Sequence, residues 1–302
     1  MQQPIQIPRN GIELAGVLYA PENFDETKQY PAIVVVHPGG GVKEQTAGLY
    51  AGKLAEAGFV TIAYDASHQG ESGGEPRYLE SPSARVADIS YMIDYFNNLH
   101  YVDNNRISAL GICAGGGYVD NAAQIDKRIK AVANVSGIDI GWLFRDAFGE
   151  DPFPTILATL EQVAQGRTAE AQGAELIVAN YVPNTAEEAA AAPLAYAREA
   201  YDYYRTPRAM CPTAPNKLLV RSFPEVLSYD ALRFVDKLLT QPLLLIVGEQ
   251  SDTAYQAESI FERAASSKKE LVRIAGATHV SLYDKDADNA AEKLVVFFKE
   301  NL

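Results

Sequence analysis

The segment from Arg106 to Tyr118 constrains this chain more than any other. It reads R-I-S-A-L-G-I-C-A-G-G-G-Y, a short apolar run that leads into Gly111-Ile112-Cys113-Ala114-Gly115. Glycines two before and two after a central residue are needed where a strand turns sharply into a helix, because neighbouring backbone passes close by. The pattern therefore predicts a strand, a sharp turn that presents Cys113, and a helix after it.

Cys113 could be a structural or a functional residue. A free cysteine is usually a small buried hydrophobe. The three glycines at 115–117 argue against that role, because each weakens a helix by about 1 kcal/mol relative to alanine. At a helix N-terminus, unpaired amides and the helix dipole favour a negative charge. We therefore expect a nucleophilic Cys113 with a lowered thiol pKa.

A second stretch, Gly70-Glu71-Ser72-Gly73-Gly74, matches the serine pattern G-x-S-x-G letter for letter. Polar residues precede it where a strand should stand. Glu75-Pro76 follows it where a helix should begin. We interpret this stretch as a loop.

The rest of the chain alternates predicted strands and helices. An apolar run such as residues 32–36 is typical of a strand buried on both faces, and Asn10-Gly11 is a hairpin signal. Strands are predicted at residues 5–9, 12–19, 32–37, 59–64, 107–110, 129–135, 243–247 and 271–274, and helices at 46–57, 82–100, 254–265 and 287–298. This order predicts an α/β fold, a mostly parallel sheet with helices on both faces.

Residues 138–240 interrupt that alternation. They contain no clear strand and are rich in alanine, tyrosine and proline, with residues 185–192 as the most helical piece. Their aromatic content is higher than a disordered linker would carry. We interpret residues 138–240 as a helical cap inserted into a core made of residues 1–137 and 241–302.

A cysteine nucleophile needs a base, and the base needs an orienting acid. Where the nucleophile stands on a sharp strand-to-helix turn, the residues follow one another along the chain in the order nucleophile, acid, histidine. His279 alone of the four histidines follows Cys113. Two carboxylates follow the predicted strand 243–247. Asp252 is preferred because the loop must first turn at Gly248, and Glu249 is the competitor.

A tetrahedral intermediate needs amide donors for its oxyanion. One is expected from Ala114, directly after the nucleophile, and the other from the loop after the third strand. That loop reads His37-Pro38-Gly39-Gly40-Gly41. Proline has no N–H, so the second donor is either Gly39 or Gly40.

Together these segments resemble the α/β hydrolases, with cysteine in place of serine. The cysteine turn is similar to that of dienelactone hydrolases. The combination with residues 37–41, 70–77 and Ala277-Thr278-His279 more closely resembles a bacterial and fungal branch that includes polyketide acyltransferases. The resemblance implies an α/β-hydrolase fold and a Cys-His-Asp triad. It also implies that Glu44 modulates the resting cysteine, as a glutamate near the oxyanion loop does in dienelactone hydrolases.

The activity implied is hydrolysis of a small-molecule ester or thioester through an acyl thioester on Cys113. Two alternatives stay open. One is transfer of the acyl group to an alcohol acceptor by the same triad, and the other is a catalytically silent ligand-binding protein on this scaffold. The aromatic cap favours uncharged medium-chain or aromatic acyl groups.

Charge and cysteine content limit the partners. A net charge of −13 disfavours nucleic acid and an anionic membrane surface. The two cysteines stand in no spacing that suggests a disulfide framework or a zinc site. We therefore expect a cytoplasmic protein that uses no metal or other cofactor and binds neither nucleic acid nor membrane, with a homodimer left open.

Overall fold

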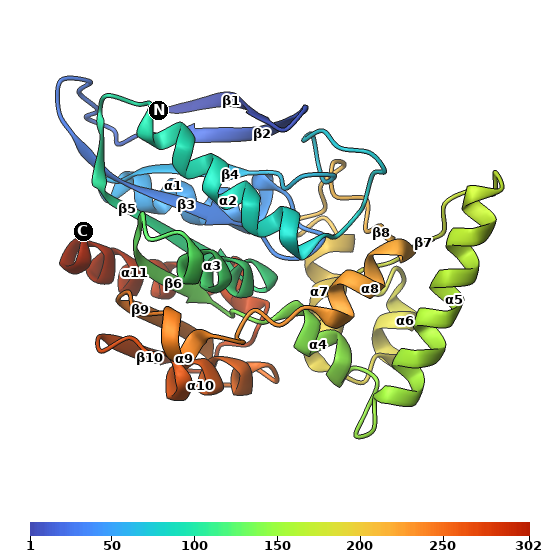
Figure 1. Cartoon of the computed structure of the whole chain (residues 1–302). Coiled ribbons are helices and arrows are strands. Elements are labelled where there is room, and N and C mark those ends of the chain that lie inside the picture. The colour runs from blue at the N-terminus through green and yellow to red at the C-terminus, as the bar shows by residue number, and fades with distance from the viewer.

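An eight-stranded sheet forms the centre of the structure, a computed structural model that describes residues 1–302 (Figure 1). Its strands lie in the order β1-β2-β4-β3-β5-β6-β9-β10. They are β1 Gln2–Arg9, β2 Ile12–Tyr19, β3 Tyr30–Val36, β4 Val60–Tyr64, β5 Val102–Ile112, β6 Ile129–Val135, β9 Leu243–Gly248 and β10 Lys269–Ile274. β2 pairs antiparallel with β1 and β4, and all other neighbours pair parallel.

The local sequence explains both parts of this sheet. The β1–β2 hairpin turns at Asn10 and Gly11, which both have positive φ (43° and 87°), as the preferred two-residue hairpin turn requires. In β3, Val34 and Val35 are fully buried on opposite faces of the sheet. An uninterrupted apolar run therefore fits a strand that helices cover on both sides.

Two layers of helices cover the sheet (Figure 1). They are α1 Gly48–Glu56, α2 Pro82–Asn97, α3 Ala114–Ile125, α10 Ala254–Arg263 and α11 Ala287–Asn301. One face packs against α2, α3 and α10 through side chains such as Met92 and Ile260. The other packs against α1 and α11 through side chains such as Leu54 and Phe298. The predicted α/β-hydrolase fold class is confirmed.

Between β6 and β9 the chain forms mostly short helices, one long helix and one small strand pair. These elements are α4 Ile140–Asp146, α5 Phe153–Ala171, β7 Val178–Ala179, α6 Ala186–Ala191, α7 Ala195–Arg205, β8 Leu218–Leu219, α8 Phe223–Ser228 and α9 Val235–Leu238. Most of them lie to one side of the sheet, with α5 outermost (Figure 1), whereas α9 packs on α3 and α10. None of the helices combines the length and apolar character that crossing a bilayer demands.

Several elements differ from the sequence predictions. The alanine-rich piece at 185–192 gives only the short α6, whereas α5 is the longest helix of this region. β7 and β8 were not predicted, because two-residue strands are too short to show a period-two pattern. A π-helical turn over Lys43–Ala47 precedes α1, so helical structure begins before the predicted residue 46.

The G-x-S-x-G stretch lies in the loop between β4 and α2, as predicted. The Ser72 hydroxyl is buried, donates to the Asp65 carbonyl oxygen (2.5 Å) and accepts the Ala15 amide (2.8 Å). Both bonds tie the loop to the sheet. Ser72 is therefore a structural residue and not a nucleophile.

Candidate active site

Cys113 forms the sharp turn between β5 and α3. Its backbone has φ 54° and ψ −123°, a region that residues other than glycine rarely adopt. A Cβ on Gly111 would lie 2.3 Å from the Gly115 carbonyl oxygen, and a Cβ on Gly115 would lie 2.3 Å from the Val36 carbonyl oxygen. The two glycines are therefore required by close backbone approach, and the turn presents Cys113 at the carboxyl end of the parallel strands.

The Cys113 thiol is surrounded by hydrogen-bond donors. Burial raises its pKa, while interactions with the Tyr283 hydroxyl and the amides of Ala114 and Gly39, together with the charge of Arg85, lower it only in part. The pKa of Cys113 thus lies above its ordinary value. The predicted lowering of this pKa was wrong, because burial outweighs the amides at the helix N-terminus.

The loop after β3 brings one glycine amide to the thiol. That amide belongs to Gly39. Gly40 has φ 70°, and a Cβ placed on it would lie 2.8 Å from the Tyr181 ring. Of the two glycines that the sequence left open, Gly39 is the one that faces Cys113 together with Ala114.

His37 holds this loop in place. Its Nε2 accepts the Ala66 amide (3.1 Å), its Nδ1 lies 2.7 Å from the Pro38 carbonyl oxygen, and its own carbonyl oxygen accepts from Arg85 (2.7 Å). Burial and the charge of Arg85 hold the pKa of His37 well below its ordinary value. His37 is therefore a neutral structural residue.

His279 lies in the turn after β10 and is buried. Its Nδ1 is 2.6 Å from the Thr253 hydroxyl, and its Nε2 is 3.1 Å from the Tyr283 hydroxyl. The Ser136 hydroxyl, at the end of β6, donates to the His279 carbonyl oxygen (2.9 Å). Burial lowers the pKa of His279 to about 4, although the charge of Asp252 opposes this shift. The imidazole is therefore neutral near pH 7.

Neither candidate carboxylate bonds to the imidazole. Asp252 is exposed, and its Oδ2 accepts the Tyr196 amide (3.2 Å). Glu249 accepts the Gly276 amide (3.0 Å). Asp252 acts on His279 through its charge, and the hydrogen-bond partner of Nδ1 is the Thr253 hydroxyl.

Sequence reasoning missed two residues of this site, Thr253 and Tyr283. Thr253 adjoins the predicted acid, so loop position alone did not separate the two. Tyr283 follows His279 by four residues, a spacing that puts two side chains on one side of a helical turn. That spacing was the available signal, and a 3₁₀ turn over Ser281–Tyr283 does follow the histidine.

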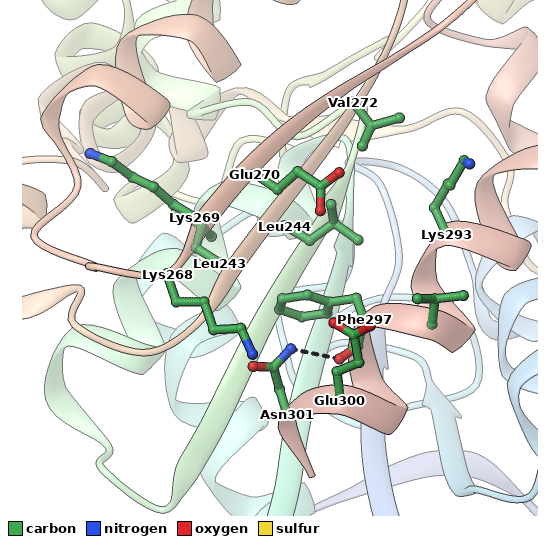
Figure 2. Close-up of a pocket in the computed structure, with 11 residues that line it drawn as sticks. Leu243, Leu244, Lys268, Lys269, Glu270, Val272, Lys293, Phe297, Glu300 and Asn301 are labelled. Atoms are coloured by element: carbon green, nitrogen blue, oxygen red, sulfur yellow. Dashed lines mark hydrogen bonds between the residues drawn. The ribbon is translucent and has the colours of Figure 1, made fainter.

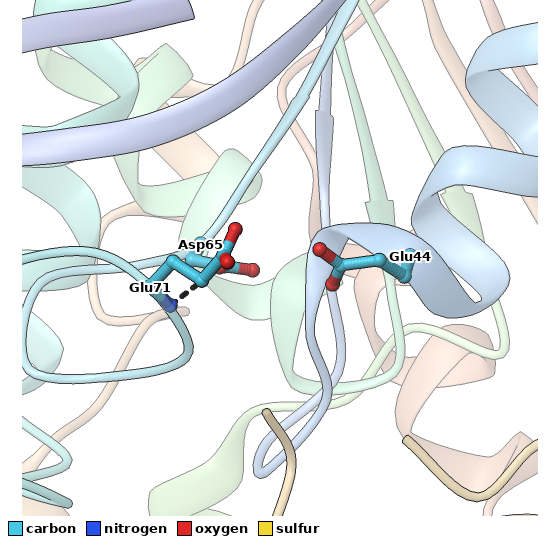
Figure 3. Close-up of side chains that lie close together, drawn as sticks. All are labelled: Glu44, Asp65 and Glu71. Carbon is cyan, nitrogen blue, oxygen red and sulfur yellow. Dashed lines mark hydrogen bonds between the residues drawn. The ribbon is translucent and has the colours of Figure 1, made fainter. Parts of the chain in front are cut away.

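Glu44 lies in a different cluster. It faces Asp65 and Glu71 (Figure 3), and the Lys43 ammonium lies 2.5 Å from Glu44, 2.9 Å from Asp65 and 2.7 Å from Glu71. Burial lowers the pKa of Lys43, but the hydrogen bonds to these carboxylates outweigh it and hold the pKa above its ordinary value. The charged lysine therefore stands where a metal ion would bind, and Glu44 is paired with Lys43.

A small apolar pocket opens beside the thiol, with a volume of about 50 Å³. Residues 138–240 supply most of its wall, including Ile140, Leu143, Tyr181 and Tyr196, and Cys113 lines it as well. No carboxylate or ammonium lines it. The pocket therefore suits an uncharged group that has only a few atoms.

A larger cavity, of about 420 Å³, shares no lining residue with the pocket beside the thiol (Figure 2). Leu243 and Lys269, the first residues of β9 and β10, line it together with Lys293 of α11. This cavity thus lies at the amino ends of β9 and β10, whereas Cys113 and His279 lie at the carboxyl ends of the strands. Ligands of open parallel sheets bind at the carboxyl ends, so we assign the small pocket to the active site.

The sheet order, the sharp turn at Cys113 and the histidine after the last strand define an α/β hydrolase. Within this class, the chain belongs to the family described as serine aminopeptidase, S33, which matches residues 28–286. The residue at the sharp turn is cysteine here, although the family's description names serine.

Three relatives illustrate the range of the match. The uncharacterized protein YcjY of Escherichia coli K12 is 48% identical over 295 residues, 96% of this chain and 95% of that protein. The protein PA2218 of Pseudomonas aeruginosa is 36% identical over 298 residues, 97% of this chain and 79% of that protein. Comparison of the present structure with the crystal structure of PA2218 gives a TM-score of 0.92 and covers 100% of this chain and 94% of that chain. A thiohydrolase of Eupenicillium brefeldianum is 23% identical over 256 residues, 83% of this chain and 80% of that protein.

Proposed function

We propose that this chain cleaves uncharged carboxylic esters or thioesters through an acyl thioester on Cys113. The observation that carries the proposal is the position of Cys113, which lines one pocket together with Gly39 and Ala114 and whose thiol is influenced by the amides of both. When sulfur attacks a carbonyl at this place, the negative charge develops where two N–H donors already point. The fungal relative named as a thiohydrolase supports thioesters as one substrate class.

His279 is the proposed base. Sulfur attacks the carbonyl carbon, and the thiol proton passes to Nε2 of His279. The imidazolium then protonates the leaving oxygen or sulfur as its bond to the acyl carbon breaks, which releases a neutral alcohol or thiol. Water next attacks the thioester, gives a proton to His279, and the expelled thiolate recovers that proton. The imidazole, whose pKa is lowered to about 4 by burial, is free to accept the first proton near neutral pH.

Asp252 completes the proposed triad through its charge. Its effect is to raise the pKa of His279, which means that it stabilises the imidazolium formed when the proton arrives. Thr253 holds Nδ1 at 2.6 Å and so fixes the ring orientation. The two functions that one carboxylate serves in serine triads are thus divided between neighbouring residues.

The pocket indicates the size and charge of the acyl group. A volume of about 50 Å³ corresponds to roughly four water-sized groups, which favours short acyl chains over the medium-chain or aromatic groups expected from the sequence. The absence of a lining carboxylate leaves an N-terminal ammonium without a counter-charge, which favours esters and thioesters over peptides. We propose that residues 138–240 act as a cap that must move to admit longer chains.

Turnover of p-nitrophenyl acetate, p-nitrophenyl benzoate and an acetyl thioester tests this function. Cys113→Ala should lower kcat/KM by about a thousandfold or more, while the control Cys211→Ala stays within about twofold of wild type. Full activity of Cys113→Ala would refute the proposal. No wild-type turnover, with tight binding of an acyl ligand, would indicate a binding protein. An acyl-alcohol product formed when an alcohol is added would indicate transfer.

A further inference from the structure

We propose that Tyr283 is a catalytic residue whose hydroxyl carries the proton from the Cys113 thiol to Nε2 of His279. This inference rests on the proposed function, because it concerns the step in which Cys113 becomes acylated. It adds a residue to the Cys-His-Asp set. The hydroxyl touches a reacting atom, the sulfur, and the base that receives the proton.

The contacts place the Tyr283 hydroxyl between nucleophile and base. It lies 3.1 Å from His279 Nε2, and Tyr283 lines the same pocket as Cys113, where its hydroxyl interacts with the thiol. The His279 ring hydrogen-bonds to the hydroxyls of Tyr283 and Thr253 and not to Cys113. In this arrangement the thiol reaches its base through the tyrosine.

The Tyr283 ring is fixed in place by its neighbours. It is buried, and its centroid lies 5.2 Å from that of Tyr203 and 6.4 Å from that of Tyr204, both in edge-to-face geometry. Tightly packed aromatic side chains of this kind keep one orientation. A rotation of the Tyr283 side chain that let sulfur contact the imidazole directly would disrupt these ring contacts. The hydroxyl is therefore expected to stay in place and to transfer the proton.

The side chains from Cys113 to Thr253 can form a continuous series of hydrogen bonds in which each group donates to the next. With Nδ1 of His279 protonated, it donates to Thr253, whose hydroxyl lies 3.1 Å from that of Ser251. Nε2 then accepts from the Tyr283 hydroxyl, and the tyrosine oxygen accepts from the Cys113 thiol. Every donor has one acceptor in this arrangement, as a productive relay requires.

The proton transfer leaves Tyr283 uncharged, because the hydroxyl gains one proton as it loses another. As sulfur bonds to the carbonyl carbon, its S–H bond breaks and the proton moves to the Tyr283 oxygen. The O–H proton of Tyr283 moves to Nε2 at the same time, so the tyrosine ends neutral and His279 becomes an imidazolium. Burial raises the pKa of Tyr283 well above its ordinary value, which favours concerted transfer over a tyrosinate intermediate.

Single-turnover acylation with p-nitrophenyl acetate tests the relay in the variant Tyr283→Phe. We expect acylation at neutral pH to slow by about a hundredfold or more, the usual contribution of a positioned acid or base. The rate should then climb by about tenfold per pH unit, because the variant depends on prior ionisation of the thiol. Wild-type acylation should change little over the same range, because its imidazole is already neutral.

Tyr50→Phe is the matched control. The Tyr50 hydroxyl donates to the Leu282 carbonyl oxygen (2.6 Å) in the same 3₁₀ turn, so its loss perturbs the turn without touching the thiol. Acylation in this control should stay within about threefold of wild type. A similar slowing in both variants would mean that Tyr283 only supports the structure and would overturn the relay.

A measurement on the unaltered protein covers the case in which Tyr283→Phe does not fold. The acylation rate is followed against the deuterium fraction of the solvent. Two protons moving together predict a curved dependence, whereas a linear dependence would overturn the relay. Unchanged or faster acylation of Tyr283→Phe would also overturn it. If the wild type forms no adduct on Cys113, the proposed function fails instead, so the two failures are distinguishable.

Discussion

The hydroxyl of Thr253 lies 2.6 Å from Nδ1 of His279, where a triad carboxylate would ordinarily bond. Asp252, the preceding residue, is exposed, accepts the Tyr196 amide and influences the imidazole by charge alone. The imidazole is thus held by a neutral hydroxyl, while the charge of Asp252 raises its pKa. This division has consequences for both residues.

We predict that Thr253→Val lowers kcat by about ten- to a hundredfold, because Nδ1 loses its buried hydrogen bond. Thr253→Ser keeps the hydroxyl and should stay near wild type. Asp252→Asn should cost less than about tenfold, because the interaction of an exposed charge is weakened by solvent. Steady-state kinetics on one ester decide the matter. A loss of about ten thousandfold in Asp252→Asn, as in serine triads, would show that Asp252 turns to bond Nδ1 during the reaction.

The raised pKa of Cys113 predicts slow alkylation near neutral pH. Iodoacetamide reacts with the thiolate, so the labelling rate should rise by about tenfold per unit from about pH 7 to about pH 9. Peptide mass spectrometry follows Cys113, with Cys211 as the internal reference in the same sample. A rate that levels off below about pH 8 would instead indicate a thiolate-imidazolium pair at rest.

Two glycines in helices should respond oppositely to alanine. A Cβ on Gly115 would lie 2.3 Å from a backbone oxygen, whereas a Cβ on Gly52 in α1 would meet nothing within 4 Å. Gly115→Ala should therefore lower the free energy of unfolding by about 1 to 3 kcal/mol or more, and Gly52→Ala should raise it by up to about 1 kcal/mol. Urea denaturation measures both. Equal stability of the two variants would contradict the close packing at Cys113.

The ammonium of Lys43 pairs with three carboxylates, among them the buried Asp65. Lys43→Ala should lower the free energy of unfolding by about 3 to 5 kcal/mol, because it leaves a buried charge without its partner. Lys53→Ala is the control, since Lys53 pairs with the exposed Asp288 and should cost no more than about 1 kcal/mol. If Lys43→Ala is as stable as the control, the cluster is not held together by its charges.

The sequence was informative where one residue type satisfies one steric demand. Gly111 and Gly115 revealed the sharp turn because no side chain fits there, and the apolar run in β3 revealed a doubly covered strand. The thiol pKa was predicted with the wrong sign, because burial depends on how distant segments pack. Thr253 and Tyr283 were missed for a related reason: each acts by occupying one position beside His279, and that position comes from the tertiary fold.

Detection of the acyl enzyme tests the central claim most directly. The protein is mixed with p-nitrophenyl acetate, quenched in acid within the first turnover, and its peptides are analysed by mass spectrometry. The account predicts one acetyl group per chain, located on Cys113, together with a burst of p-nitrophenol that disappears in Cys113→Ala. A burst that persists in Cys113→Ala, or an acetyl group on another residue while Cys113 stays unmodified, would contradict it.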